Sequence, residues 1–566
     1  MNPRSVVALF LMLLLLGCRV QKPALQPTPR SALKGTEAPI TIPAATPSPS
    51  NTPCCQVRLH PEKPFYVGDQ ISFEVIAPSE ERFLNQSMTV TLTSAPNPIG
   101  TATFQPFGFD RRTQATMLWA WDTSLLQAGQ YTLQFSIPTL KEEWTETVAL
   151  LPRSAMPVAE RSARWQALDT PCCTLHFITN TAAHRDLEEI VEIVEREYQA
   201  VLQKIPLEQK EERPQVVLIP RVIGNGGFAN GEINVSYLDR NYTAADFATI
   251  LHHEMVHVVD QQVNQDERPS LFVEGIAVYL SGGHYIPEPL LTRAAVLYNL
   301  NRHFPLRDLA EDFYSHQHES AYLEAGALVE YMSQRWGWQT VWKTYLSMSL
   351  KSGETHLQAI ERSLNENLGI SLQRLEQDYF AYLGSIEENV LTFQDVANLT
   401  LHYETLRNYQ QLLDPAAYFR TAWMLDARQM RSKGIVADYW RHPRQPENIT
   451  IELLLNEAGR ARRAGEIVQG AAFLDAIKCA LEGLKEKHPE PFSCHGSAKS
   501  GWEIVQILLA AGYEPQMWVR DLGYAEVIVT QGSTQLKQVI LELRGEEWQI
   551  VSGTNAAADE LIEGTQ

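Results

Sequence analysis

Two histidines and a glutamate in the stretch His253-Glu254-Met255-Val256-His257 carry the clearest chemistry in this sequence. Residues four apart project from the same face of a helix, so His253 and His257 would lie one turn apart. Two neutral imidazoles in that arrangement can bind one divalent ion. Glu254 would point about 100° further round the helix, beside the open position of the ion. We therefore predict a zinc site with Glu254 as its general base.

A third ligand is expected from the helix that follows. Glu274 comes after a turn that contains Asp266 and Pro269, residues that can end one helix and start another. Two antiparallel helices joined in this way would bring Glu274 against His253 and His257. Zinc held by two histidines and a carboxylate keeps a fourth position for water and lowers the pKa of that water. One Zn²⁺ per chain is the predicted cofactor.

Asp260 lies one helical turn beyond His257. A carboxylate at that position can orient the imidazole of a metal ligand by accepting its other N–H. The alternative is an aspartate that ends its helix at the surface. We predict the orienting role and keep the alternative open.

These motifs resemble a known family. The segment His253–His257, followed by Phe-Val-Glu-Gly-Ile-Ala-Val-Tyr at 272–279, is similar to the gluzincin branch of the zinc metallopeptidases, in the peptidase MA-like clan. The resemblance covers roughly residues 175–386 and implies Glu274 as the third zinc ligand. Segment 320–327 resembles the family segment whose tyrosine stabilises the oxyanion, which implies that role for Tyr322. The alternative for Tyr322 is a core tyrosine. The amino-terminus-binding Gly-x-Met-Glu-Asn motif is absent, so exopeptidase activity is not implied.

The elements expected around the site form an α+β, zincin-like domain over residues 174–388. Strands are predicted at 174–179 and 215–219, and helical spacing recurs at 184–205, 289–300, 320–336, 340–350 and 371–383. A glycine-rich segment leads into a predicted edge strand at 232–237. In gluzincins such an edge pairs with the extended substrate backbone. An ordinary glycine-rich hairpin is the alternative.

The amino-terminal residues are predicted to be a signal for export. Residues 1–18 contain an apolar run too short to span a bilayer and end in Leu-Leu-Gly-Cys, which resembles a bacterial lipoprotein signal with lipidation at Cys18. A plain secretory signal is the alternative. Residues 19–53 are rich in Pro, Thr and Ser and predict a linker, up to roughly 100 Å long when extended. The expected location is the outer face of the bacterial cell membrane, with the lipid anchor as the contact to the bilayer.

The charge balance excludes some partners. The formal net charge is −20, whereas binding to nucleic acid or to anionic lipid rewards a basic surface. We therefore expect no nucleic-acid partner, and a peptide or protein as the substrate.

Six cysteines remain once Cys18 is assigned to the lipid. Cys54-Cys55 and Cys172-Cys173 both follow Thr-Pro, each at the head of a predicted domain. Disulfides are favoured outside the cytoplasm, so one or two bonds between these pairs are expected. Bonds within each pair and a four-thiolate metal site are alternatives. Cys479 and Cys494 are candidates for a further bridge.

The whole chain is predicted to be multidomain. Alternating apolar residues and regular turns indicate an immunoglobulin-like β-sandwich at 54–152, with a linker at 153–173. A helical connector is expected at 389–445, with a helical stretch at 416–433. Residues 446–566 predict an α+β module, with helices at 465–486 and 502–511 and strand-like runs at 525–530, 536–543 and 548–551. Its ending resembles the last hairpin of the cone-shaped nuclear-transport-factor fold.

Together these features predict a membrane-anchored zinc metallopeptidase, an endopeptidase that hydrolyses peptide bonds through a zinc-activated water. A non-catalytic surface scaffold and a zinc amidase acting on cell-wall peptides are the alternatives. The sequence contains no signal for cleavage preference, oligomeric state, or gating by a partner or propeptide.

Overall fold

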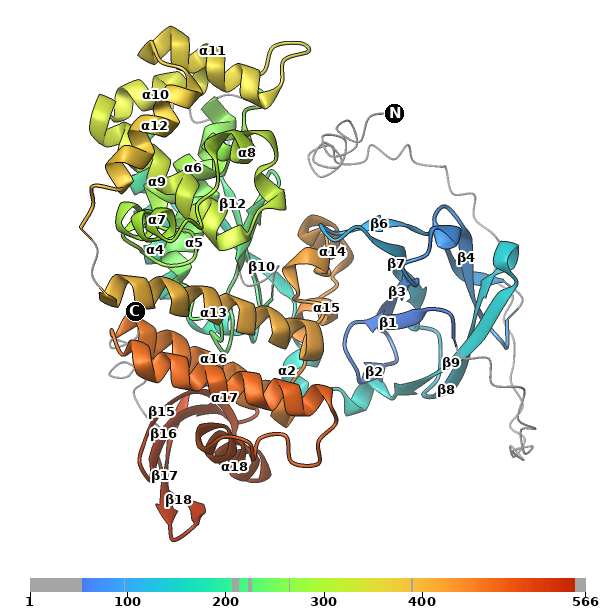
Figure 1. The fold of residues 1–566 in the computed structure, drawn as a ribbon. Coiled ribbons are helices and arrows are strands. Elements are labelled where there is room, and N and C mark those ends of the chain that lie inside the picture. The colour runs from blue at the N-terminus through green and yellow to red at the C-terminus, as the bar shows by residue number, and fades with distance from the viewer. Residues whose placement is uncertain are drawn as a thin grey trace, which may run out of the picture.

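The computed structural model describes residues 53–95, 97–205, 213–221, 226–263, 265–387 and 390–554. The predicted signal peptide, Cys18 and nearly all of the predicted 19–53 linker lie outside these residues. The chain is multidomain, as expected, with two-sheet structure towards the N-terminus and mostly helical structure towards the C-terminus (Figure 1). Among the described helices, none has the length and apolar character needed to cross a membrane.

The N-terminal domain consists of two sheets around one core. The first sheet has the order β1-β3-β7-β6 and the second β2-β9-β8-β4-β5. Neighbouring strands are antiparallel, except that β2 and β9 are parallel. The strands are β1 (Gln56–His60), β2 (Phe65–Tyr66), β3 (Gln70–Ile76), β4 (Ser87–Leu92), β5 (Pro98–Thr103), β6 (Gln105–Phe107), β7 (Arg112–Asp122), β8 (Gly129–Ile137) and β9 (Glu142–Leu151).

The alternating apolar residues of these strands fill the space between the sheets. Phe73 on β3 and Phe135 on β8 are fully buried, and their rings meet edge to face with centroids 6.1 Å apart. Trp144 on β9 stacks on Phe135 at 5.3 Å. Successive residues of a strand point to opposite faces, so this alternation is what makes one face of each sheet apolar.

The central domain contains a mixed five-stranded sheet with the order β10-β11-β12-β14-β13. Its strands are β10 (Trp165–Asp169), β11 (Thr174–Ile178), β12 (Gln215–Ile219), β13 (Gly227–Ala229) and β14 (Ile233–Ser236). Two of them differ from the sequence expectation. β10 lies inside the predicted 153–173 linker and pairs antiparallel with β11. β14 is not an edge strand, because the glycine-rich segment folds back on it as the short antiparallel strand β13, which becomes the edge.

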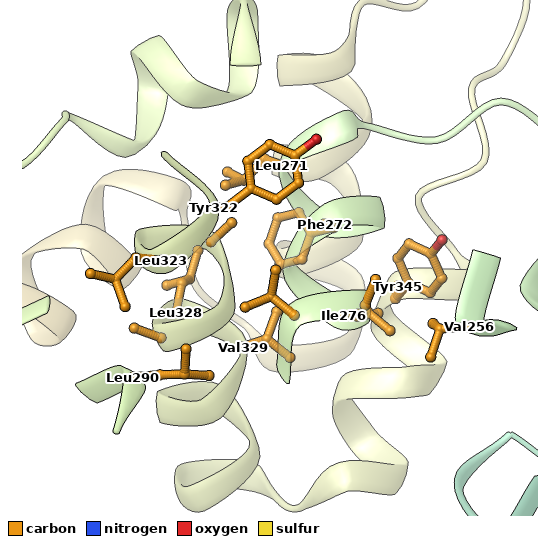
Figure 2. Packing of buried hydrophobic residues seen from close by; sticks show 14 of the residues in the cluster. Val256, Leu271, Phe272, Ile276, Leu290, Tyr322, Leu323, Leu328, Val329 and Tyr345 are labelled. Carbon is orange, nitrogen blue, oxygen red and sulfur yellow. The ribbon is translucent and has the colours of Figure 1, made fainter. Parts of the chain in front are cut away.

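Helices cover this sheet and form most of the domain (Figure 1). The largest apolar cluster of the protein joins the sheet to α4, α5, α6, α7 and α9. Figure 2 shows its centre, where Phe272 and Ile276 on α6 face Leu328 and Val329 on α9. The helices are α2 (Val158–Arg161), α3 (Ala182–Arg185), α4 (Leu187–Lys204), α5 (Phe247–Val263), α6 (Ser270–Ser281), α7 (Leu290–Asn299), α8 (Leu306–Glu311), α9 (His318–Trp336), α10 (Trp338–Leu346), α11 (His356–Leu368) and α12 (Leu372–Leu383).

Two glycines allow α6 and α9 to approach closely. A Cβ atom at Gly275 would lie 2.7 Å from the carbonyl oxygen of Ala325, and one at Gly326 would lie 2.4 Å from a methyl carbon of Val278. Any larger residue would push the two helices apart. The close contact matters for the site, because Glu274 precedes Gly275 on α6 and Tyr322 lies one turn before Gly326 on α9.

Glu324 on α9 is a buried carboxyl group. It is 1% exposed and accepts hydrogen bonds from the backbone N–H of Phe304 at 3.0 and 3.2 Å. Burial raises the pKa of Glu324 to about 8, because the charged form loses its hydration. The folded protein therefore retains this proton at pH values where the unfolded chain has released it.

The raised pKa of Glu324 predicts that the free energy of unfolding depends on pH. The free energy of unfolding should fall as the pH rises from 4.5, the ordinary pKa of a glutamate, to about 8. In this range the Glu324 carboxyl ionises in the unfolded chain but stays protonated in the folded protein, which favours the unfolded chain. Glu324→Gln should remove this loss, making the variant more stable than the wild type at pH 9 by on the order of a few kcal/mol and similar to it near pH 4. Urea unfolding at several pH values measures the difference. Exposed Glu188→Gln controls for the change in net charge, and parallel curves for wild type and Glu324→Gln would contradict the prediction.

The C-terminal domain packs helices on an antiparallel sheet with the order β15-β16-β17-β18. One apolar core joins α13, α16, α17, α18 and this sheet, so α13 belongs to this domain although it was expected in the connector. The elements are α13 (Val390–Leu413), α14 (Ala427–Lys433), α15 (Ala437–Trp440), α16 (Pro446–Arg463), α17 (Ile467–Lys485), α18 (Gly496–Ala510), β15 (Glu514–Asp521), β16 (Tyr524–Thr530), β17 (Lys537–Arg544) and β18 (Glu547–Thr554).

Helices α14 and α15 lie between domains (Figure 1). Their apolar residues share a small core with Trp119 of the N-terminal domain and with Ile178, Val217 and Ile219 of the central sheet. The predicted helix at 416–433 is correspondingly shorter and begins only at Ala427. The expected connector therefore joins the N-terminal and central domains through side-chain packing.

A buried group of charges attaches the C-terminal domain to the central domain. Glu452 on α16 is fully buried and accepts from Arg221 at 2.7 Å, from Arg240 at 2.6 Å and from the hydroxyl of Tyr409 at 2.6 Å. Both arginines belong to loops of the central domain. Arg221 also pairs with Asp414, after α13. The carboxylate thus bridges two buried arginines, of which Arg240 also pairs with Glu514 at 2.9 Å.

The cysteines differ in part from the expectation. Cys479 and Cys494 are joined by a disulfide. No disulfide joins Cys54 or Cys55 to Cys172 or Cys173, so the bonds expected between the two Thr-Pro-Cys-Cys pairs are not present. The physical reason is that the two pairs pack in different cores: Cys55 lies in the N-terminal core, whereas Cys172 and Cys173 lie in the central core. No four-thiolate metal site occurs among the described residues.

Candidate metal centre

Helices α5 and α6 place the predicted ligands side by side. α5 begins at Phe247, where the side chain of Asp246 accepts from the backbone N–H of Thr249 at 2.7 Å and caps the first turn. α6 begins at Ser270, directly after Pro269. The turn between them reverses the chain, so that Glu274 on α6 faces His253 and His257 on α5.

The three side chains converge on one point. The Nε2 atoms of His253 and His257 are 3.1 Å apart. The Oε2 atom of Glu274 lies 3.3 Å from each of them. This is the cluster among the described residues whose donor atoms are placed to bind a metal ion.

These separations fit a zinc ion. Zinc–nitrogen and zinc–oxygen bonds of about 2.0–2.1 Å at tetrahedral angles place neighbouring ligand atoms about 3.3 Å apart. The three measured separations agree with that value. In addition, Oε2 of Glu274 is buried and faces the two imidazole nitrogens, each 3.3 Å away. A cation bound between these three atoms would be coordinated by all of them.

The protonation of the cluster reflects burial and mutual pairing. Burial lowers the pKa of His253. Burial also opposes charge on His257, but the Glu274 carboxylate outweighs it and raises the pKa of His257 to about 9. Burial would raise the pKa of Glu274, yet the two histidines hold it well below its usual range. The positive charge beside the buried carboxylate is thus supplied by the protonated His257 imidazole, and a bound divalent cation would take the place of that proton.

Glu254 lies between the metal ligands and the edge strand. It is buried, and a Cβ atom on Gly227 of β13 would come within 2.7 Å of its Cγ atom and 3.1 Å of Oε1. Only a glycine leaves room for this carboxylate under the strand. Burial raises the pKa of Glu254 to about 7. The side chain predicted as the general base thus lies against the edge strand of the sheet, which is β13 and not the predicted strand at 232–237.

Tyr314 is a functional candidate that the sequence did not indicate. Its hydroxyl donates to Oε1 of Glu274 at 2.7 Å. Tyr314 lies in a short 3-10 helix, Phe313–Ser315, just before α9. A hydrogen bond of this kind fixes the orientation of a carboxylate so that its other oxygen faces the ion.

Tyr314→Phe is expected to weaken zinc binding about 10- to 100-fold, the usual effect of removing a partner that orients a metal ligand. Competition with a chromogenic chelator measures the affinity. Tyr382→Phe is the matched control, because that hydroxyl also bonds a side chain, Gln334, but lies on α12. Equal zinc affinity in Tyr314→Phe and wild type would remove the residue from the site.

Tyr322 lies beside the cluster but makes ring contacts rather than a described hydrogen bond. Its ring centroid is 6.1 Å from that of His253, and it stacks on His284 at 3.9 Å. Figure 2 shows Tyr322 at the edge of the apolar cluster, with its hydroxyl directed away from Leu328 and Val329. The ring of Tyr322 is thus part of the core, as expected of a core tyrosine. Its hydroxyl is directed away from the core, so the oxyanion-stabilising role stays a prediction.

His284 is the second residue that the sequence analysis missed. It follows two glycines after α6, where no helical spacing marks it, and its ring lies between Tyr322 and His318. Burial holds the pKa of His284 well below its usual range. The ring is therefore neutral at ordinary pH and supports the position of the Tyr322 ring.

The C-terminal domain reaches the same region. The ring of Phe419 lies 5.3 Å from that of His318, which in turn contacts Tyr322 at 4.5 Å. Arg407 on α13 forms an ion pair with Glu319 at the start of α9. One side of the candidate site is thus formed by residues outside the central domain.

Asp260 has other partners than those predicted. Its Oδ2 atom accepts from Arg268 at 2.9 Å and from the hydroxyl of Tyr345 at 2.5 Å. Its Oδ1 atom is buried without a hydrogen-bond partner among the described residues. Asp260 therefore stabilises the turn after α5, and its role in orienting His257 stays a prediction.

Comparison with known proteins does not assign the chain to a family. The sequence matches no model of a known protein family, and a search of curated proteins finds none with significant similarity.

Proposed function

We propose that this protein is an extracytoplasmic, lipid-anchored zinc metallopeptidase of the gluzincin type, acting as an endopeptidase. The observation that carries the proposal is the spacing of three donor atoms: the two Nε2 atoms and one Oε2 atom lie 3.1–3.3 Å apart. The lipid anchor at Cys18 and the export of the chain rest on the sequence alone.

The proposed folds of the domains agree with this function. The two-sheet N-terminal domain would be an immunoglobulin-like spacer, and the central domain a zincin-like catalytic domain. The C-terminal helices and sheet would be a cone of the nuclear-transport-factor type. The support is the order of strands and helices, with an antiparallel sheet under α18 in the last domain.

His253, His257 and Glu274 would hold the zinc ion. When bound there, zinc supplies a Lewis acid that polarises a peptide carbonyl and makes water acidic. Glu254 would accept the proton of the attacking water on its carboxylate and return it to the leaving amine. The Tyr322 hydroxyl would donate to the carbonyl oxygen as negative charge develops on it. Tyr314 would keep Glu274 in the orientation that leaves Oε2 for the ion.

The edge strand β13 would bind the substrate backbone. Its outer side is not paired within the described sheet, since β13 is the last strand in the order. An extended peptide can add to such an edge through backbone hydrogen bonds. Gly227 would then place the peptide directly over Glu254, because no side chain separates the strand from that carboxylate.

Glu274→Ala tests the metal site directly. The variant is expected to lose its zinc on dialysis against a chelator that leaves the wild type loaded, because two histidines alone hold the ion far less tightly than three ligands. Elemental analysis gives the metal content, and a peptide library measures cleavage by both proteins. Glu311→Ala, at an exposed position on α8, controls for the loss of one carboxylate. Full retention of zinc in Glu274→Ala would reject the proposed centre, and loaded wild type that cleaves no peptide would reject the activity.

A further inference from the structure

The turn between β13 and β14 carries a buried carboxylate. Glu232 is the last residue of this turn and is 5% exposed. The turn is tight: Gly231 has a φ of +82°, and the backbone N–H of Asn230 donates to the carbonyl oxygen of Glu232 at 3.0 Å. The side-chain amide of Asn234 donates to the side chain of Asn230 at 3.1 Å. These contacts do not involve the Glu232 carboxylate, whose partners lie on another element.

Two arginines of α14 bind this carboxylate. Oε1 of Glu232 accepts from Nη2 of Arg431 at 2.5 Å and from Nε of Arg428 at 3.2 Å. The side chains of Arg431 and Glu232 are 14% and 6% exposed, whereas that of Arg428 is 66% exposed. An exposed ion pair contributes little to stability, and the loss of one partner from a buried pair has a much larger effect. The ion pair between Arg431 and Glu232 is therefore the main contact between α14 and the turn.

The edge strand itself packs on the core that contains α14. Phe228 on β13 contacts this small core, to which Ala427 and Met430 of α14 contribute. The same core contains Trp119 of the N-terminal domain. The hairpin of β13 and β14 is thus attached to α14 in two places, through an ion pair at its turn and through an aromatic ring on its outer strand.

The same hairpin borders the candidate metal centre. A Cβ atom on Gly227 of β13 would lie 2.7 Å from Cγ of Glu254 and 2.9 Å from the carbonyl oxygen of Asn234 on β14. Strand β13 is three residues long, and within the described sheet it pairs with β14 alone. A strand this short has few backbone hydrogen bonds of its own and opens locally at low cost. Its position over Glu254 therefore depends on the contacts that hold the hairpin to α14.

We propose that Arg431 is a positioning residue for β13, and that its ion pair with Glu232 keeps this strand ready to bind an extended substrate backbone. The substrate at this edge rests on the proposed peptidase function, whereas the attachment of the hairpin to α14 does not. A strand that holds its binding conformation a tenth of the time binds about 10-fold more weakly. The strand would contact the substrate backbone in the ground state and the transition state alike, so the loss appears in KM and not in kcat.

Hydrogen–deuterium exchange of the full-length protein tests the attachment. In Arg431→Met, the amides of residues 227–234 are expected to exchange about 10-fold faster than in wild type, while those of β12 stay unchanged. Glu232→Gln removes the same ion pair from the other side and should give the same result. Arg307→Met is the matched control, because Arg307 pairs with the exposed Glu311 on α8 at 3.2 Å. Unchanged exchange at 227–234 in Arg431→Met, or equally faster exchange in β12, would overturn the proposal.

Steady-state cleavage of a library peptide tests the consequence for the substrate. KM is expected to rise about 10-fold in Arg431→Met and in Glu232→Gln, with kcat and zinc content unchanged. The double variant should have the KM of either single variant, because both changes act through one contact, whereas independent effects would multiply. A lower kcat at constant KM, or effects that multiply, would overturn the positioning role. Zinc-loaded wild type that cleaves no peptide would reject the proposed function instead, and the exchange experiment would still decide whether Arg431 positions β13.

Discussion

Glu254→Gln is expected to lower the rate of peptide cleavage about 100- to 10,000-fold while the protein keeps one zinc ion per chain. General acid–base groups contribute rate factors of this size. Glutamine has nearly the same shape as glutamate, so it still fits under Gly227, but its amide cannot accept the proton of the attacking water. Glu254 is not among the three converging donor atoms, so metal content should not change. The measurement is kcat on a cleavable library peptide, together with elemental analysis of the same sample.

A matched control separates loss of the base from loss of a charge. Glu366→Gln makes the same chemical change on α11, at a side chain that is 57% exposed, and should leave both kcat and zinc content unaltered. Turnover by Glu254→Gln equal to that of wild type would remove this residue from the mechanism. A variant that loses both zinc and activity would instead make Glu254 part of the metal site.

The second large effect is expected from Glu452→Ala, at the contact between the central and C-terminal domains. The substitution leaves Arg240 and Arg221 buried without their shared carboxylate. Removing one partner from a buried ion pair typically costs about 3–5 kcal/mol. The two arginines outweigh the effect of burial on Glu452 and hold its pKa at about 2, so the pairing stabilises the fold above the ordinary pKa of 4.5 and is lost as pH falls towards 2.

Urea unfolding at pH 7 measures this loss as a shift of the transition of the C-terminal domain to lower urea. Glu482→Ala, at an exposed position on α17, controls for the loss of a helical glutamate. Wild type and Glu452→Ala should converge as the pH falls towards 2. A loss below about 1 kcal/mol at pH 7, the value typical of surface pairs, would show that the two arginines find other partners.

The metal ligands could be predicted because the chemistry leaves a local pattern. His253 and His257 are on one helical face and Glu274 on the next helix, and the structure brings these three together. Tyr314 and His284 left no such pattern. Tyr314 reaches Glu274 from a short loop segment 40 residues further along the chain, and a single tyrosine in a loop has no periodicity that marks it. Positions of this kind follow from tertiary packing.

Helix α16 escaped prediction because it is buried along most of its length, including polar residues such as Asn448, Glu452 and Glu457. Sequence reasoning finds helices by an apolar stripe opposite a polar face, and here charged residues belong to the core because arginines from other elements neutralise them. In contrast, β8 of the N-terminal domain follows the regular alternation of buried and half-buried residues, and it was predicted as a strand.

The glycine-rich segment illustrates the limit for strands. Both a substrate-facing edge and an ordinary hairpin were compatible with its sequence, and the structure contains a hairpin whose first strand is the edge. The pattern of apolar residues could not decide which strand was outermost, because that depends on where β12 pairs. β12 adds in parallel to β14, and this long-range pairing leaves β13 outside.

The shared core of α14 and α15 with Trp119 and the central sheet has a mechanical consequence. An apolar contact of this kind resists hinge motion, so the N-terminal and central domains would move together as one rigid body. If the predicted tether precedes β1, its attachment would set the orientation of the candidate metal centre relative to the membrane as well as its distance from it. The orientation of the candidate metal centre relative to the N-terminal domain would then depend on the side chains packed around Trp119.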